Sequence, residues 1–143
     1  MLATPGWADF QAGLYAYVRG DYDTALKEFR PLADQGHADA QFALGSMYYQ
    51  GKGLPQDYHK AVKWCRLAAD QGLAEAQAFL GGMYYFGQGV PNDYVLAHMW
   101  ANLAAAKGVN ESVKMRDNLE RFMTPQQIAE AQRLAREWKA KGK

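Results

Sequence analysis

Residues 36–71 read GHADAQFALGSMYYQGKGLPQDYHKAVKWCRLAADQ, and residues 72–107 read GLAEAQAFLGGMYYFGQGVPNDYVLAHMWANLAAAK. Aligned at an offset of 36 residues without a gap, the two stretches are identical at 19 of 36 positions. Self-similarity at a fixed period of this length is typical of repeat proteins, in which each repeat is one supersecondary unit. The chain therefore contains a tandem repeat, and its fold has to be predicted from that repeat.

Each repeat is predicted to form two α-helices joined by a glycine-rich turn. Ala40, Leu44 and Tyr48 recur at four-residue steps, which places them on one face of a helix. Gly51 follows as a residue that accepts the left-handed backbone of a helix C-terminus. The second helix carries Ala61 and Ala68 on its own apolar stripe. The predicted first helices are residues 38–50 and 74–86, and the predicted second helices are residues 57–70 and 93–107.

Small residues at matching positions indicate that the two helices of a repeat approach each other closely. These residues are Gly45 and Ala61 in one repeat and Gly81 and Ala97 in the next. Trp64 and Trp100 are predicted to fill the space beside them. The single cysteine, Cys65, lies next to this stripe and has Ala101 as its counterpart, so it is interpreted as a small core residue and not as a reactive thiol.

The flanking segments complete an all-α solenoid, an α-α superhelix of helix-turn-helix repeats. Residues 5–35 form a shorter repeat whose turn lacks four residues, and residues 109–143 depart from the pattern. Asn110 is predicted to cap a helix through about residue 122, and Thr124 to cap a last helix over 125–139 through a capping box. Terminal elements of a solenoid are expected to be atypical. We predict a single domain over 5–143, with repeats 5–35, 36–71 and 72–108 and C-terminal capping helices 109–143.

Composition and residue spacing argue against several classes of function. Sixteen Lys and Arg residues against fifteen Asp and Glu residues give a net charge of +1, which disfavours binding to nucleic acid. The apolar stretches fall short of the ~18–20 residues that span a bilayer. His37, His59 and His98 share no metal-ligand spacing, and the GKG and GQG turns lack the pattern of a phosphate-binding loop. No enzymatic activity, cofactor or metal is predicted.

The repeated string A-x-x-x-L-G-x-M-Y-x-x-G-x-G-[LV]-P-x-D-x-x-x-A-x-x-W-x-x-x-A-A resembles the Sel-1-like repeat, a relative of the tetratricopeptide repeat. Residues 9–35 are closer to the tetratricopeptide form. The resemblance implies a right-handed superhelix whose concave face is lined by the first helix of each repeat. It also implies an adaptor that holds proteins or peptides in assemblies, often in bacterial envelope, secretion or signalling systems. Some secreted relatives carry a disulfide in each repeat and are associated with β-lactam binding, but this chain lacks those cysteine pairs.

Residues that the repeat scaffold does not need are the candidates for partner contacts. On the first helices they are Phe10, Leu14, Tyr17, Val18, Phe42, Ser46, Tyr49, Gln50, Ala78, Gly82, Tyr85 and Phe86. Aromatic side chains on a groove provide rigid contact area of the kind enriched in binding hot spots. The set predicted to bind a protein or peptide partner on the concave face is Tyr17, Phe42, Ser46, Tyr49, Gln50, Tyr85 and Phe86.

Two further functions stay open at this point. One is a secreted or periplasmic envelope protein that binds peptidoglycan-like or β-lactam ligands, and the other is a subunit that forms a homo-oligomer through the groove or through Trp138. The first ten residues do not form an intact signal peptide, although Ala8 before Asp9 is the context that a signal peptidase leaves. A cytoplasmic and a periplasmic or secreted location are both compatible with the sequence.

Overall fold

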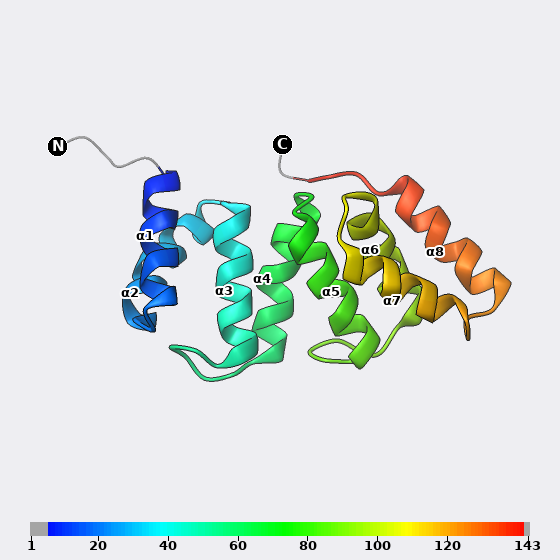
Figure 1. Ribbon diagram of the computed structural model, residues 1–143, viewed down its shortest axis with the longest axis horizontal. Helices are drawn as coiled ribbons and strands as arrows, with labels where there is room; N and C mark the ends of the chain where they lie inside the picture. Colours follow the sequence, from blue (N-terminus) through cyan, green and yellow to red (C-terminus); the bar gives the residue numbers. More distant parts are fainter. Residues whose placement is uncertain (1–5, 142–143) are drawn as a thin grey trace.

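The computed structural model describes residues 6–141, which form eight α-helices and no strand. The helices follow one another along the long axis of the molecule (Figure 1). The three hairpins pair α1 (Gly6–Val18) with α2 (Tyr22–Asp34), α3 (Ala38–Gln50) with α4 (Tyr58–Asp70), and α5 (Ala74–Phe86) with α6 (Tyr94–Ala106); α7 (Asn110–Glu120) and α8 (Pro125–Glu137) follow. The predicted all-α solenoid is confirmed. Residues 1–5, which hold most of the segment before Asp9, lie outside the described residues.

Helix boundaries follow from local capping chemistry. Gly51 and Gly87 end α3 and α5 in the left-handed conformation, with φ of 69° and 67°. The side chains of Asp57 and Asp93 each accept a hydrogen bond from the backbone three residues on, so both aspartates are N-caps. The capping box at Thr124 is also confirmed. The predicted Asn110 cap is wrong, because Val109 occupies the N-cap position and makes no side-chain hydrogen bond there.

In the second and third hairpins, the two helices approach each other closely at a glycine that occupies the same position in both repeats. A Cβ atom added to Gly45 would lie 2.7 Å from the Cys65 Sγ atom and 3.2 Å from the Ala61 carbonyl oxygen. A Cβ atom on Gly81 would lie 3.3 Å from the carbonyl oxygen of Ala97. The close approach predicted from the small residues is therefore confirmed, and any larger side chain at Gly45 must push the hairpin open.

Successive hairpins stack because the second helix of one packs on the first helix of the next. Two buried glutamines reinforce these interfaces: Gln41 Nε2 donates to the carbonyl oxygen of Ala33, and Gln77 Nε2 donates to that of Ala69, each over 3.2 Å. The turn between α3 and α4 also contacts the first hairpin, since a Cβ atom on Gly53 would lie 2.8 Å from Tyr22 Cβ. Each interface thus combines apolar burial with a hydrogen bond to a helix end.

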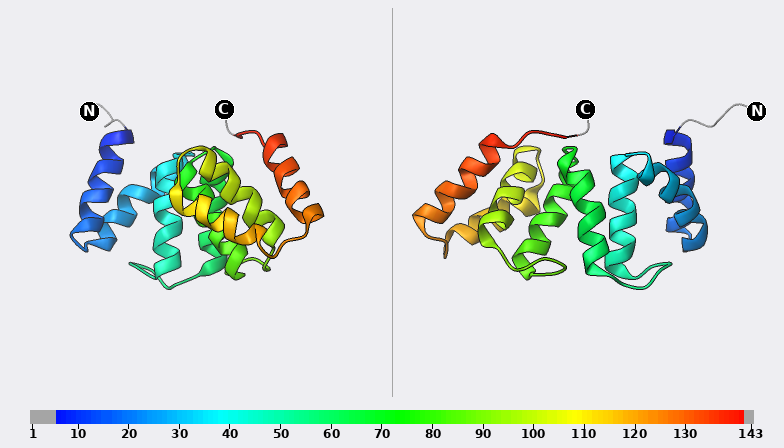
Figure 2. Two further views of the ribbon diagram at one scale, coloured as in Figure 1. Left: turned by 45° about the vertical axis from the view of Figure 1, so that its right-hand side comes forward. Right: turned by 180° about the vertical axis from the view of Figure 1, so that it is seen from behind.

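The C-terminal helices do not form a fourth hairpin of the same kind. Both α7 and α8 pack mainly against α6, and the chain after α8 runs back over the ends of α4 and α5 (Figure 1, Figure 2). Trp138 lies against Trp100 with 6.4 Å between ring centroids, and the Lys141 N–H donates to the carbonyl oxygen of Asp70 over 2.6 Å. Trp138 is therefore half-buried within its own chain, which weakens the case for self-association through it. The role of residues 109–143 as a cap stays a prediction.

The two repeat tryptophans differ in burial, contrary to the expectation that both fill the core. Trp100 is 4% exposed, whereas Trp64 is half-buried with the Lys63 ammonium 5.5 Å from its ring. Trp138 packs on Trp100, whereas Trp64 lies at the edge of the core cluster formed by α1, α2 and α3 and is only partly buried there. The two positions are equivalent in the repeat but not in the packed array.

We expect Trp100→Ala to lower the free energy of unfolding by about 3–5 kcal/mol, because it empties a closed site. Trp64→Ala should cost about 1–2 kcal/mol, because less apolar area is removed from the interior. Urea unfolding followed by far-UV circular dichroism measures both. Equal losses would contradict the burial difference.

A second pair of variants tests the helix contact. Gly45→Ala should destabilise the protein by about 1–3 kcal/mol through overpacking against Cys65. Gly82→Ala is the matched control: it lies in the middle of the next first helix with nothing within 4 Å of its added Cβ. The control should gain about 0.5–1 kcal/mol, because alanine favours the helical backbone over glycine. Melting temperatures that move in the same direction would refute the close-approach argument.

Candidate binding groove

A hollow of about 290 Å³ lies between the first helices of the first two hairpins, and we call it the first hollow. The second helix α2 packs between α1 and α3, so these two first helices are kept apart and their outward side chains border a gap. Phe29 of α2 is 1% exposed and forms the floor of that gap. Its remaining lining residues come from α1 and α3: Phe10, Leu14, Tyr17, Asp39, Phe42, Ala43, Ser46 and Gln50.

A smaller hollow of about 120 Å³ lies one repeat further along, between α3 and α5, and we call it the second hollow. Its positions correspond to those of the first: Tyr49 takes the place of Tyr17, and Gly82 that of Ser46. It is lined by Tyr49, Phe79, Gly82, Met83, Phe86 and Gln88. The two hollows are repeats of one surface on the face formed by the first helices.

A one-position shift of a phenylalanine explains why the hollows differ in size. The second repeat has Phe42 followed by Ala43, whereas the third repeat has Ala78 followed by Phe79. The Phe79 ring lies 4.9 Å from the Tyr49 ring and 5.9 Å from the Phe42 ring, and it lines the second hollow. Ala43 is too small to do the same in the first hollow, which is left open.

A polar cluster closes one end of the first hollow. The Tyr17 hydroxyl donates to Gln50 Oε1 over 2.8 Å and accepts a hydrogen bond from Lys52 Nζ at 3.3 Å. The hydrogen bond to Tyr17 raises the pKa of Lys52 above its ordinary value, so the ammonium stays charged. In the second hollow, the Tyr49 hydroxyl donates to Gln88 Oε1 over 3.0 Å, and Gln88 is the counterpart of Lys52. The tyrosine contact thus recurs, with a cation, Lys52, at the first hollow and a neutral side chain, Gln88, at the corresponding position of the second.

The structure separates the predicted partner-binding residues into three places. Tyr17, Phe42, Ser46 and Gln50 come together in the first hollow, while Tyr49 and Phe86 line the second. Tyr85 lines neither hollow, because its ring packs on Phe86 and Tyr94. Val18 is 83% exposed on the outer side of α1. That these residues bind a partner stays a prediction.

Six residues that line the hollows were not among the sequence-based candidates: Phe29, Asp39, Ala43, Phe79, Met83 and Gln88. For Ala43 and Phe79 the aligned repeats contain a signal, the exchanged order of Phe and Ala at 42–43 and 78–79. Ala43 has no feature typical of a binding residue, because it affects the hollow through its small volume.

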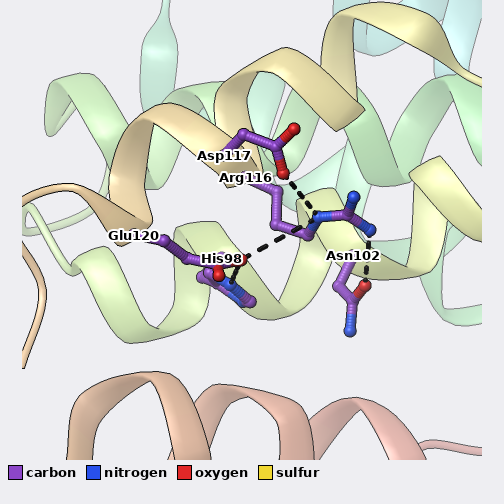
Figure 3. A network of polar contacts seen from close by, with 5 residues as sticks. All are labelled: His98, Asn102, Arg116, Asp117 and Glu120. Carbon is purple, nitrogen blue, oxygen red and sulfur yellow. Dashed lines mark hydrogen bonds and ion pairs between the residues drawn. The ribbon is translucent and has the colours of Figure 1, made fainter. Parts of the chain in front are cut away.

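The histidines have separate surroundings. His37 Nδ1 accepts the Ala40 N–H as the cap of α3, and His59 is exposed. His98 is fully buried, and its Nε2 atom lies 2.9 Å from Glu120 Oε2, which joins α6 to α7 in a network extended by Arg116 (Figure 3). Within residues 6–141, no three His, Cys, Asp or Glu side chains are grouped so that they could hold a metal ion.

Cys65 is fully buried beneath Gly45 in the second hairpin. Burial raises the pKa of its thiol to about 12, because the apolar surroundings disfavour the charged thiolate. The thiolate is the reactive form of cysteine. The interpretation of Cys65 as a core residue therefore agrees with its environment.

The fold and the repeated surface agree with a known family. The family model for the Sel1 repeat matches residues 38–73 and 74–109, so the chain belongs to the Sel1 repeat family. Proteins of this family generally mediate protein–protein interactions and act as non-enzymatic scaffolds. Among the helices described in residues 6–141, none is long and apolar enough to cross a membrane.

Two solved structures share the fold. The first is c5321, a protective antigen of uropathogenic Escherichia coli strains displaying an SLR fold, with a TM-score of 0.88 and 34% identity over 94% of this chain and 30% of that one. The second is a Sel1 repeat protein from Oxalobacter formigenes, with a TM-score of 0.72 and 35% identity over 79% of this chain and 88% of that one.

A curated relative is similar over a short stretch only. An exopolysaccharide production negative regulator of Rhizobium leguminosarum bv. viciae is 38% identical over 48 residues, which are 34% of this chain and 18% of the relative. The chain thus spans less than a third of the length of both this regulator and the Escherichia coli antigen.

We expect Cys65 to be unreactive in the native protein. At pH 8, on the order of one thiol in ten thousand would be ionised at its raised pKa, so the aromatic disulfide reagent DTNB should release no thionitrobenzoate within an hour. The same protein in urea should react within minutes, and Cys65→Ala should not react in either condition. Rapid reaction of the native protein would contradict the burial of Cys65.

Proposed function

We propose that this chain is a non-enzymatic adaptor that binds a peptide segment of a protein partner along the face formed by its first helices. The open first hollow is the observation that carries this proposal. It is floored by a buried phenylalanine, walled mainly by apolar side chains, and open to solvent between two rigid helices. Membership of a family that generally mediates protein–protein interactions supports the same conclusion.

The size of the first hollow suits one large side chain of a peptide. Its volume of about 290 Å³ lies at the lower end of the ~300–1,000 Å³ that small-molecule pockets occupy. A peptide that inserts one large apolar residue there would bury that residue against Phe29 and Phe42. Such anchors in well-packed pockets supply most of the affinity of many interfaces.

The second hollow extends this surface for the rest of the peptide. Phe86 is 66% exposed at its edge, and Phe122 and Tyr94 form a ring contact nearby with 4.9 Å between centroids. Exposed aromatic side chains beside a shallow hollow add contact area without requiring deep insertion. The proposed ligand therefore crosses from the first hollow towards the third hairpin.

The variant Ala43→Phe tests the proposal by installing in the first hollow the ring that Phe79 places in the second. It should lower the affinity for an anchored peptide at least ten-fold, because a hot-spot contact is worth about 2 kcal/mol or more. The probe is a library of random peptides displayed on phage and selected on the wild-type protein, followed by calorimetric titration of the best synthetic peptide.

The matched control is Ala129→Phe, which makes the same change at an exposed position of α8. It should leave binding unchanged, and circular dichroism should show both variants folded. Equal affinity of the wild-type protein and Ala43→Phe would overturn the proposal.

A further inference from the structure

The first hollow carries opposite charges at its two ends. Asp39 lines it in the first turn of α3, and Lys52 lies just beyond Gln50, the last residue of that helix. Asp39 and Gln50 are eleven positions apart on this helix, a distance of about 16.5 Å at 1.5 Å per residue. An extended peptide of about five residues covers that distance. A bound peptide would therefore meet an anionic end and a cationic end on either side of its apolar anchor.

The repeat shows which of the two charges the fold does not require. Asp39 has an acidic counterpart, Glu75, in the first turn of α5, where both carboxylates favour the helix dipole. Lys52 has the neutral Gln88 as its counterpart, and Gln88 also contacts a tyrosine hydroxyl, as the acceptor of the hydrogen bond and not as its donor. A glutamine is thus sufficient for the scaffold contact, and the charge at Lys52 is additional to it.

The Lys52 ammonium is held in place without an opposite charge. Its Nζ atom donates to the Tyr17 hydroxyl and lies 5.2 Å and 5.7 Å from the ring centroids of Tyr17 and Tyr22. Among the residues that the structure describes, no carboxylate forms an ion pair with it. A lysine ammonium has three N–H donors, and Tyr17 and Tyr22 together engage at most two of them, so one stays available for a ligand at the end of the hollow.

We propose that the partner peptide carries an aspartate or glutamate side chain two or three residues from its apolar anchor, and that this carboxylate binds Lys52. The inference rests on the proposed function of the first hollow. Asp39 repels a carboxylate at the opposite end, so the two charges also set the direction in which the peptide lies across α1 and α3. The acidic residue of the peptide then lies at the Lys52 end of the hollow, and its apolar anchor lies in the centre.

The test compares peptides selected from the random library by the wild-type protein and by Lys52→Gln, which reproduces the residue of the third repeat. Peptides selected on the wild-type protein should be enriched at least about three-fold in Asp and Glu near the anchor, and those selected on Lys52→Gln should keep the anchor and lose the enrichment. Equal acidic content in both selections would overturn the inference.

Synthetic peptides with amidated C-termini then isolate the side-chain carboxylate. Replacing the acidic residue of the best peptide by its amide should weaken binding to the wild-type protein about three- to ten-fold, and should not change binding to Lys52→Gln. Lys52→Arg should restore the preference, and raising the salt concentration should reduce it. The matched control is Lys60→Gln, which removes an ammonium that lies over Tyr48 outside the hollow and should have no effect.

The two proposals fail in different ways. If Ala43→Phe abolishes peptide selection while Lys52→Gln selects the same acidic peptides as the wild-type protein, peptide binding in the first hollow is supported and the inference about Lys52 is wrong. If Ala43→Phe selects the same peptides as the wild-type protein, the proposed function is wrong and the inference falls with it.

Discussion

The structure depends on the contact between the two helices of each hairpin at a glycine of the first helix. In the second and third hairpins this glycine admits the backbone of the second helix, at Ala61 and Ala97. In the first hairpin the same position, Gly13, admits a ring instead, since an added Cβ would lie 2.5 Å from Phe29 Cε1. One constraint therefore produces both the tight hairpins and the aromatic floor of the first hollow.

Stacking of the hairpins then leaves gaps between successive first helices on one face of the molecule. Each second helix packs against the next first helix, which keeps successive first helices apart and leaves a gap that only side chains can fill. Where Phe79 fills it, little space is left; where Ala43 stands, a pocket is left. The difference between the two hollows thus arises from a departure from the repeat, at positions 43 and 79.

Much of the fold could be predicted, and the reasons for the errors are specific. The ranges 38–50 and 74–86 coincide with α3 and α5, because glycine and aspartate at the turns determine helix ends through local hydrogen bonds. Trp64 was placed wrongly because its burial depends on whether another segment covers it. Tyr85 was grouped with Tyr17 and Tyr49 by repeat position, but its neighbours on α5 and α6 engage its ring. The lining of the two hollows was therefore predicted in part, and binding of a partner there stays a prediction.

The amino-acid sequence by itself determined the repeat, the hairpins and the close helix contacts, since these depend on residues near one another in the chain and on a pattern that occurs twice. Only the tertiary structure decided which gap between first helices stays open, where the cation of Lys52 lies, and how the chain beyond α8 returns to α4. Those features depend on side-chain volume and on segments distant in sequence, whose distances a repeat alignment does not contain.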